Sequence, residues 1–274
     1  MQARIWGCRG SLATPGGDTL RYGGNTTCVE VRAESGAVVV LDAGTGVRDL
    51  GRVLADERVR EIDLLLTHLH LDHIEGLGFL ASMFDPECAV RIYGPRPDGG
   101  SLEEKLTNYL SPPYFPLPFE RFDASISFHE IERDTFELDG LTVTSVPVRH
   151  PGPTLAYRLV EDARSFAFVP DNEPGLDRES GLDVAGGADV LLHDSQYTDE
   201  EYGQRIGWGH ASLSHLVRYL GDAAPKRAVM VHHDPDHDAD DLERLLADAR
   251  GRSGRDEAEL ELGHEGLDLT LSPS

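Results

Sequence analysis

Short runs of apolar and β-branched residues, separated by turns rich in glycine, proline and acidic residues, recur along the first third of the chain. Such runs are typical of buried strands. The predicted strands are Arg4–Trp6, Cys28–Arg32, Val38–Asp42, Ile62–Thr67 and Val90–Tyr93. Apolar residues at helical spacing predict helices over Gly46–Ala55 and Glu75–Met83.

The middle of the chain changes character at a proline-rich, aromatic loop insert, predicted over about residues 101–120. Its second half, Ser111–Glu120, is aromatic and broken by prolines, so we predict a loop. Strands resume afterwards, with a hairpin turn predicted at Asp139-Gly140. The predicted strands are Ser125–Ile131, Leu141–Val148, Thr154–Leu159 and Phe166–Val169.

The last third alternates again between strand and helix patterns. The predicted elements are strand Val190–His193, helix Leu213–Leu220, strand Ala228–His232, helix Ala239–Ala249 and two short strands near the end. No linker or repeat divides the sequence. We therefore predict one α/β domain over residues 1–274, in which two sheets pack face to face with helices outside, an αββα sandwich.

Composition narrows the choice of partners. Acidic residues outnumber basic ones by 49 to 25, for a net charge of −24, and the basic residues form no run. Nucleic-acid binding depends on basic side chains that neutralise phosphates, so long RNA or DNA is disfavoured. We expect a cytoplasmic protein without a membrane segment, because no secretory signal or stretch of ~20 apolar residues is present. The cysteines, Cys8, Cys28 and Cys88, are interpreted as small buried apolar residues.

The densest cluster of chemically active residues follows the strand predicted over Ile62–Thr67. His68 and His70 are separated by one residue, so in extended backbone both imidazoles would face the same side and could share a metal. Asp72 and His73 follow in the same turn and suit a second metal ~3.5–4 Å from the first. Packing alone hardly explains so many ligand-type residues, and we predict a metal site.

Other ligand-type residues lie where predicted strands end and turns begin. They are Asp42, His150, Asp171 and His233. Loops at strand ends are where rigid scaffolds present ligands. If the last strand ended one residue earlier, His232 would be the ligand in place of His233.

These segments, in this order, resemble the five motifs of the metallo-β-lactamase superfamily, over nearly the whole chain. The resemblance implies one metal bound by His68, His70 and His150, a second bound by Asp72, His73 and His233, and Asp171 bridging the two. Alignment with the family's last histidine favours His233 over His232. Asp42 resembles the family's buried support for the histidine turn. The implied cofactors are two zinc ions, although nitrogen and oxygen ligands also suit manganese or iron.

Further motifs resemble the ribonuclease Z branch of this superfamily. These are Gly7-Cys8-Arg9-Gly10-Ser11, Leu191-Leu192-His193-Asp194-Ser195 and Gly209-His210-Ala211-Ser212. By this resemblance His210, supported by Asp194, would hold a phosphate oxygen or protonate the leaving group. The alternatives are a helix-start residue for His210 and a cap or turn residue for Asp194.

One departure from ribonuclease Z concerns the substrate. The flexible basic arm that grips transfer RNA in that family has no counterpart here, which favours the small-substrate members of the branch, including cyclic-nucleotide phosphodiesterases. The resemblance thus implies hydrolysis of a small phosphodiester, with a cyclic nucleotide preferred, by a metal-bridging hydroxide that Asp72 and Asp171 orient. Tyr114 and Phe115 are candidates for stacking on a base, or for packing in a homodimer. Another hydrolase of this fold, such as a thioesterase or lactonase, or a ribonuclease Z-like nuclease, is the alternative.

Overall fold

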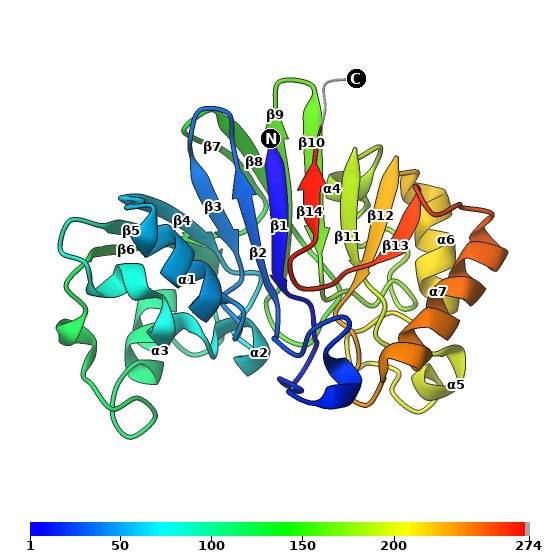
Figure 1. Ribbon diagram of the computed structural model, residues 1–274, viewed down its shortest axis with the longest axis horizontal. Coiled ribbons are helices and arrows are strands. Elements are labelled where there is room, and N and C mark those ends of the chain that lie inside the picture. Colours follow the sequence, from blue (N-terminus) through cyan, green and yellow to red (C-terminus); the bar gives the residue numbers. More distant parts are fainter. Residues whose placement is uncertain (272–274) are drawn as a thin grey trace.

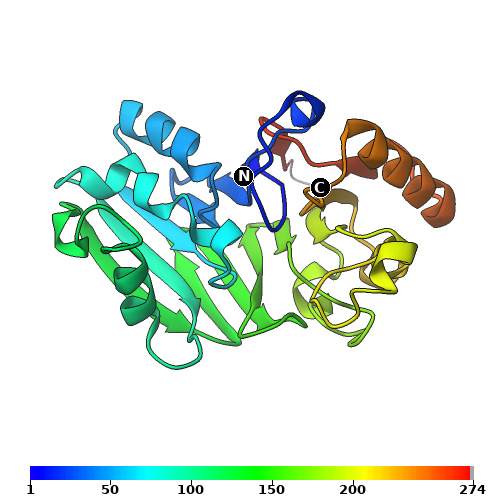
Figure 2. The same cartoon turned by 90° about the horizontal axis from the view of Figure 1, so that it is seen from below.

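Two mixed β-sheets pack face to face, and helices cover the outer face of each sheet (Figure 1). The computed structural model describes residues 1–271. Figure 2, seen from below, shows the helices on the two outer sides of the paired sheets. The predicted αββα sandwich is confirmed.

The first sheet contains strands from both ends of the described chain. Its order is β14 (Asp268–Thr270), β1 (Gln2–Gly7), β2 (Cys28–Arg32), β3 (Val38–Leu41), β4 (Glu61–Leu65), β5 (Ala89–Pro95) and β6 (Ser125–Ile131). Neighbours are antiparallel from β14 to β3 and parallel from β3 to β6.

The second sheet repeats this arrangement. Its order is β13 (Leu260–Leu262), β12 (Arg227–Val231), β11 (Val190–Asp194), β10 (Arg164–Val169), β9 (Leu155–Glu161), β8 (Leu141–Pro147) and β7 (Asp134–Leu138). Neighbours are parallel from β13 to β10 and antiparallel from β10 to β7. Parallel neighbours require crossover connections, and these crossovers carry the outer helices.

The helices divide between the two outer faces. They are α1 (Val47–Asp56), α2 (Leu71–Ile74), α3 (Leu102–Tyr109), α4 (Leu182–Ala185), α5 (Asp199–Tyr202), α6 (Leu213–Ala223) and α7 (Ala239–Ser253). Short 3-10 turns occur at Gly17–Thr19, Leu77–Phe79, Ala81–Phe84 and Phe119–Arg121. Helices α1 and α3 pack on the first sheet, and α4, α6 and α7 pack on the second. Within residues 1–271, none of these helices has the length and apolar character that a membrane crossing requires.

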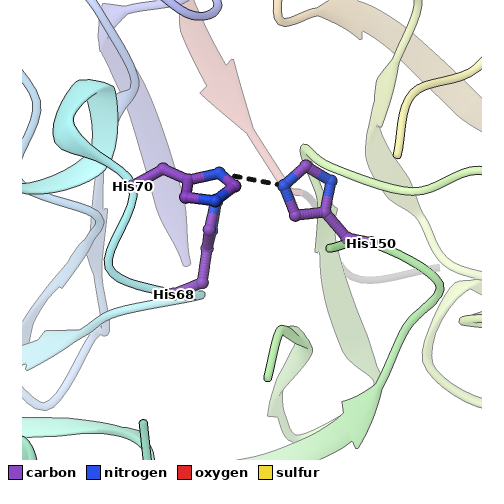
Figure 3. Close-up of side chains that lie close together, drawn as sticks. All are labelled: His68, His70 and His150. Carbon is purple, nitrogen blue, oxygen red and sulfur yellow. Dashed lines mark hydrogen bonds between the residues drawn. The ribbon is translucent and has the colours of Figure 1, made fainter. Parts of the chain in front are cut away.

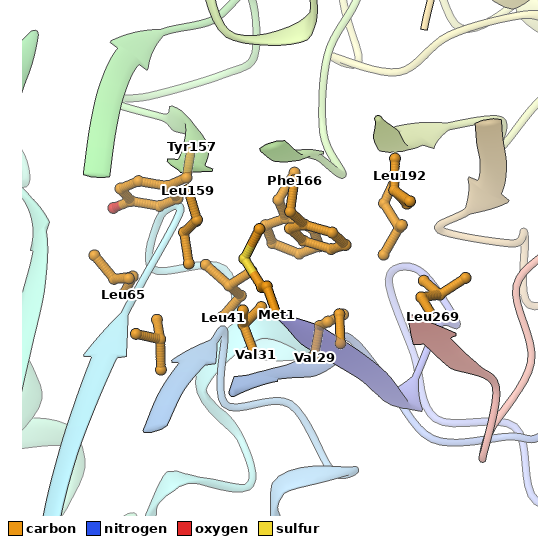
Figure 4. Close-up of a cluster of buried hydrophobic side chains, with 14 of the residues drawn as sticks. Met1, Val29, Val31, Leu41, Leu65, Tyr157, Leu159, Phe166, Leu192 and Leu269 are labelled. Carbon is orange, nitrogen blue, oxygen red and sulfur yellow. The ribbon is translucent and has the colours of Figure 1, made fainter. Parts of the chain in front are cut away.

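The central core lies between the two sheets (Figure 4). Side chains alternate between the two faces of a strand, and in β10 the side chains on both faces include apolar ones. Phe166 and Phe168 enter the core between the sheets, whereas Ala167 and Val169 face the core beneath the helices. Each sheet is therefore covered on both faces along its central strands.

Three sequence predictions need correction, and one strand was not predicted. The helix predicted over Glu75–Met83 does not form: α2 ends at Ile74, and two 3-10 turns follow it, in part because glycines in this run are poor helix formers. The insert at about residues 101–120 is not all loop, since it contains α3, whose N-cap residue Ser101 forms a capping box with Glu104. Strand β7 was not expected, although its two-residue turn to β8 was. Strand β12 ends at Val231 rather than His232.

The buried hydroxyl of Tyr157 joins the two sheets just before the histidine motif. It donates a hydrogen bond of 2.6 Å to the carbonyl oxygen of Leu66. We expect Tyr157→Phe to lower the free energy of unfolding by about 1–3 kcal/mol, because that carbonyl loses its buried partner. Chemical denaturation measures the change. The matched control, Tyr114→Phe at a side chain that is 78% exposed, should change stability by less than about 0.5 kcal/mol. Equal effects of the two substitutions would contradict this account.

Candidate metal centre

Ligand-type residues from the first sheet gather where its parallel strands end. Asp42 directly follows β3, and His68 and His70 follow β4. The short helix α2 then carries Asp72 and His73, both of them buried. Parallel neighbours end at the same edge of a sheet, so these residues meet although β3 and β4 are far apart along the chain.

The second sheet supplies residues to the same edge. His150 lies beyond the end of β8, Asp171 follows β10, Asp194 ends β11 and His232 directly follows β12. His210 lies just before α6. All five side chains are buried.

The first group consists of His68, His70 and His150, whose rings converge from the two sheets (Figure 3). The Nε2 atom of His150 lies 3.1 Å from Nδ1 of His70. The ring centre of His68 is 4.4 Å from that of His70 and 4.7 Å from that of His150. Converging imidazole nitrogens of this kind suit zinc and similar cations.

A second group consists of Asp72, His73 and His232. Oδ2 of Asp72 lies 3.3 Å from Nε2 of His73 and 3.2 Å from Nε2 of His232. Its position is fixed by the backbone N–H of Ser11, which donates to the same oxygen at 2.7 Å.

Asp171 lies between the two groups. Its Oδ1 atom is 3.2 Å from Nε2 of His73 and 3.4 Å from Nε2 of His232. Its Oδ2 atom is 3.8 Å from Nε2 of His68 and 3.7 Å from Nε2 of His150. One carboxylate oxygen therefore faces each group.

The residues fit a pair of metal cations. Nε2 of His68, Nε2 of His73 and Oδ1 of Asp171 are buried without a hydrogen-bond partner in the described part of the chain. An unpaired buried polar atom costs about 1–3 kcal/mol, and a bound cation would remove that cost. Two groups of nitrogen and oxygen donors that share one carboxylate match the ligand chemistry of zinc, manganese or iron.

The electrostatic field differs between the two groups. Burial lowers the pKa of His150 to about 4 and that of His68 well below its usual value. Burial would also lower the pKa of His232, but Asp171 and Asp72 raise it to about 9. For His73 burial again opposes protonation, and Asp171, Asp72 and Asp42 raise the pKa well above its usual value. The carboxylates thus favour positive charge at this point, whether a proton or a metal carries it.

Asp42 supports the histidine turn from below. Its Oδ2 atom accepts a hydrogen bond of 2.8 Å from Nδ1 of His73, and Oδ1 accepts one of 2.7 Å from the backbone N–H of Thr67. A proton held on Nδ1 leaves the Nε2 lone pair of His73 directed at the centre. The hydroxyl of Thr67 lies 3.0 Å from Nδ1 of His68, so this side chain contacts both the carboxylate and a ring of the first group.

Two other rings are oriented from the second sheet. Nδ1 of His150 donates to the carbonyl oxygen of Gly209 at 2.9 Å, and Nδ1 of His232 donates to Oε1 of Gln196 at 2.9 Å. Both rings therefore present Nε2 to the centre.

The structure corrects the choice between His232 and His233. Because β12 ends at Val231, His232 adopts a φ of 58° and faces the two aspartates of the centre. His233 points elsewhere. Its Nε2 atom donates to the carbonyl oxygen of Gly263 at 2.9 Å, and burial lowers its pKa to about 3. A Cβ atom at Gly10 would lie 2.3 Å from Nδ1 of His232, so only glycine allows the ring to occupy this position.

His210 and Asp194 form a pair beside the centre. Nδ1 of His210 lies 2.9 Å from Oδ2 of Asp194. The other oxygen of this carboxylate, Oδ1, accepts hydrogen bonds from the backbone N–H groups of Gln196 and Ala211. The ring of His210 is stacked on that of His232 at 4.8 Å. Asp194 contacts His210 through Nδ1, so the Nε2 atom of this ring is not engaged by Asp194.

The proline-rich loop packs Phe115 against other aromatic side chains of the chain. Its ring packs 6.0 Å from that of Phe79 and 5.8 Å from that of Phe122, against the core beneath the first sheet. Phe115 is therefore packed against the protein's own core. Tyr114 is 78% exposed.

Sequence patterns did not single out two residues that organise the site, Gln196 and Glu173. Gln196 orients His232, and Glu173 is buried and accepts hydrogen bonds from the backbone N–H groups of Gly207 and Gly209. The only local signal for Glu173 is its place two residues after Asp171 in a turn that contains proline and glycine.

Comparisons with known proteins identify the family of this chain. The family described as the beta-lactamase superfamily domain matches residues 38–233, and the chain belongs to this family. It is 25% identical over 222 residues to a ribonuclease Z of Prochlorococcus marinus (strain NATL1A), covering 63% of this chain and 70% of that protein.

Solved structures share the fold over nearly the whole chain. The metallo-beta-lactamase fold protein YhfI from Bacillus subtilis has a TM-score of 0.75 at 16% identity, covering 98% of each chain. A diphosphatase from the PhnP family has a TM-score of 0.71 at 20% identity, covering 99% of this chain and 98% of that one.

Adjacent histidines provide a matched test of the ligand assignment. His232→Ala should reduce bound metal from about two ions per chain to about one, because it removes a donor of the second group. His233→Ala should retain the metal of the wild type. Metal content is measured by mass spectrometry after dialysis. Loss of metal from His233→Ala alone would reverse the assignment.

The support from Asp42 can be tested separately. We expect Asp42→Asn to weaken metal binding by about 10–100-fold, because the charge that orients His73 is lost while every direct ligand stays. Titration with a competing chelator measures the affinity. Asp63→Asn is a suitable control, since this buried carboxylate pairs with Arg91 away from the centre. An unchanged affinity in Asp42→Asn would contradict the supporting role.

Proposed function

We propose that this protein is a dinuclear-metal phosphodiesterase that hydrolyses small phosphodiesters, with cyclic nucleotides as the preferred class. The observation that carries the proposal is the His210–Asp194 pair beside a centre whose two groups share Asp171. A histidine held by a carboxylate next to a pair of cations suits the transfer of charge and protons at a phosphate. Sequence similarity to ribonuclease Z supports the same chemistry.

The proposed metal ligands form two groups that share one aspartate. His68, His70 and His150 would hold one cation, Asp72, His73 and His232 the other, and Asp171 would contact both. Bound cations supply Lewis acidity towards phosphoryl oxygens and lower the pKa of water.

Among the protein side chains, Asp72 and Asp171 would orient the attacking water by accepting its hydrogen bonds. Nε2 of His210 would hold a non-bridging oxygen or give a proton to the leaving alkoxide, while Asp194 fixes the ring through Nδ1.

Similarity to ribonuclease Z also favours a second candidate, an RNA nuclease. Two features support the small substrate instead. Between His150 and Asp171 the chain forms the hairpin of β9 and β10, with only residues 162 and 163 between the strands. A net charge of −24 opposes binding to a polyanion. A small diester would place a single phosphate at the centre, where the bound cations would offset the negative charge of the protein.

Zinc is the proposed metal, with manganese or iron as alternatives that the same ligands would accept. We further propose a cytoplasmic protein. A homodimer is proposed as the setting in which Tyr114, exposed near the proline-rich turn, would be covered.

Hydrolysis can be tested directly with zinc-loaded and manganese-loaded protein. We expect turnover of bis(p-nitrophenyl) phosphate and of 3′,5′-cyclic nucleotides, loss of activity on chelation, and recovery when metal is returned. His210→Ala should lower kcat by about 10²–10⁴-fold with unchanged metal content, because it removes the proton donor and leaves the cations in place. Steady-state kinetics and metal analysis provide the readouts.

The control is His129→Ala, an exposed histidine of β6, which should keep wild-type activity. Turnover of S-lactoylglutathione or a lactone without any diester hydrolysis would assign the protein to the carbon-acting hydrolases. Cleavage of a transfer-RNA precursor without cyclic-nucleotide turnover would favour the nuclease.

A further inference from the structure

An exposed tryptophan lies on the loop between α5 and α6, residues 203–212, which also carries His210. Trp208 is 59% exposed and lies two residues before His210, and Ile206 is also 59% exposed. Figure 1 shows α5 at the same lower edge of the molecule as α2, which carries Asp72 and His73. A large exposed aromatic surface on the loop that carries His210 is a ready contact for an aromatic ligand.

The backbone on both sides of Trp208 is fixed by one buried carboxylate. Oε1 of Glu173 accepts hydrogen bonds of 2.8 Å from the N–H of Gly207 and 2.7 Å from the hydroxyl of Tyr202, and Oε2 accepts one of 2.8 Å from the N–H of Gly209. Glu173 itself is 1% exposed. Little conformational entropy would be lost when a ligand contacts a segment already held in this way.

The same segment is connected to the centre. The carbonyl oxygen of Gly209 accepts the 2.9 Å hydrogen bond from Nδ1 of His150. Gly209 has a φ of 96°, and a Cβ atom there would lie 2.2 Å from that nitrogen. Trp208 is thus the sequence neighbour of Gly209, which contacts the proposed metal ligand His150 directly.

Arg205 places positive charge near Trp208 and near Tyr197, whose ring contacts that of His210. Its guanidinium carbon lies 5.9 Å from the ring centre of Trp208 and 5.0 Å from that of Tyr197, whose ring is 5.7 Å from that of His210. Its side-chain hydrogen bond is a long one, 3.5 Å, to a carbonyl oxygen rather than to a carboxylate. In a chain of net charge −24, an arginine at this place favours an anionic ligand.

We propose that Trp208 and Arg205 form the surface that receives the nucleoside part of the substrate, with Trp208 stacking on the base. The inference rests on the proposed phosphodiesterase function and names its substrate class as phosphate esters that carry a flat aromatic group. It assigns base contact to the loop of residues 203–212 instead of Tyr114 and Phe115. Trp208 is a specificity-determining residue, and Glu173 is a positioning residue that holds the loop.

The test compares two phosphate monoesters that differ only by the base, adenosine 5′-monophosphate and ribose 5-phosphate, on zinc-loaded full-length protein. We expect the nucleotide to bind about 10-fold more tightly, as measured by calorimetry, because base stacking on an aromatic side chain has about this value. Trp208→Ala should bring the two affinities together, and Trp208→Phe should keep most of the difference. Tyr114→Ala is the matched control at another exposed aromatic residue and should leave the difference unchanged.

Fluorescence offers a second readout, because Trp6 and Trp208 are the tryptophans of the chain. In a Trp6→Phe background, adenosine 5′-monophosphate should quench the emission of Trp208, and ribose 5-phosphate should not. Equal affinities of the two ligands in the wild type, or an affinity difference that survives in Trp208→Ala, would overturn the proposal.

These measurements do not depend on turnover. Base-dependent binding without hydrolysis of any diester would refute the proposed function alone, because the stacking surface would stand. Hydrolysis of diesters without base-dependent binding would refute the stacking surface alone.

Discussion

The carboxylate of Asp171 is the interaction on which the rest of the site depends. It is buried, it comes from the second sheet, and its two oxygens face imidazoles from both sheets at 3.2–3.8 Å. A buried carboxylate is stable only where positive charge and hydrogen bonds compensate it. The two sheets must therefore pack in a register that brings the turn after β4 against the ends of β8, β10 and β12.

A further layer of hydrogen bonds makes this arrangement rigid. Asp42 orients His73 from the first sheet, while Gln196 orients His232 from the second. Glu173 fixes the loop whose Gly209 carbonyl orients His150. Each supporting group acts on a ring through the nitrogen that faces away from the centre, so the nitrogens that remain are directed at the place where cations fit. The loop held by Glu173 also presents the aromatic surface proposed for the substrate, which couples substrate contact to the geometry of the centre.

Much of the fold could be predicted because the apolar pattern of buried strands is local. Strand β2 was predicted with its observed bounds, and most other strands lie within two residues of their predicted positions. Helix α3 could have been recognised from the capping box of Ser101 and Glu104. The helix predicted over Glu75–Met83 failed for a tertiary reason as well as for the low helix propensity of its glycines, since a Cβ atom at Gly76 would lie 2.1 Å from the carbonyl oxygen of Gly44 and this close contact sets the path of the chain. The pairing of β14 with β1 joins the two ends of the described chain, and no local pattern specifies it.

By itself the sequence determined the family and the residues of one half of the site, because His68, His70, Asp72 and His73 lie within a single turn and their spacing is sufficient evidence of a metal centre. Tertiary structure alone decided which histidine completes the other half. In the sequence, His232 and His233 are equivalent candidates for a metal ligand. The choice between them depends on where β12 ends and on the pairing of His233 with the N-terminal segment. In this pairing the backbone N–H of His233 donates to the carbonyl oxygen of Cys8 at 3.0 Å. That pairing joins residues more than two hundred positions apart, and a contact at such a distance leaves no trace in local spacing.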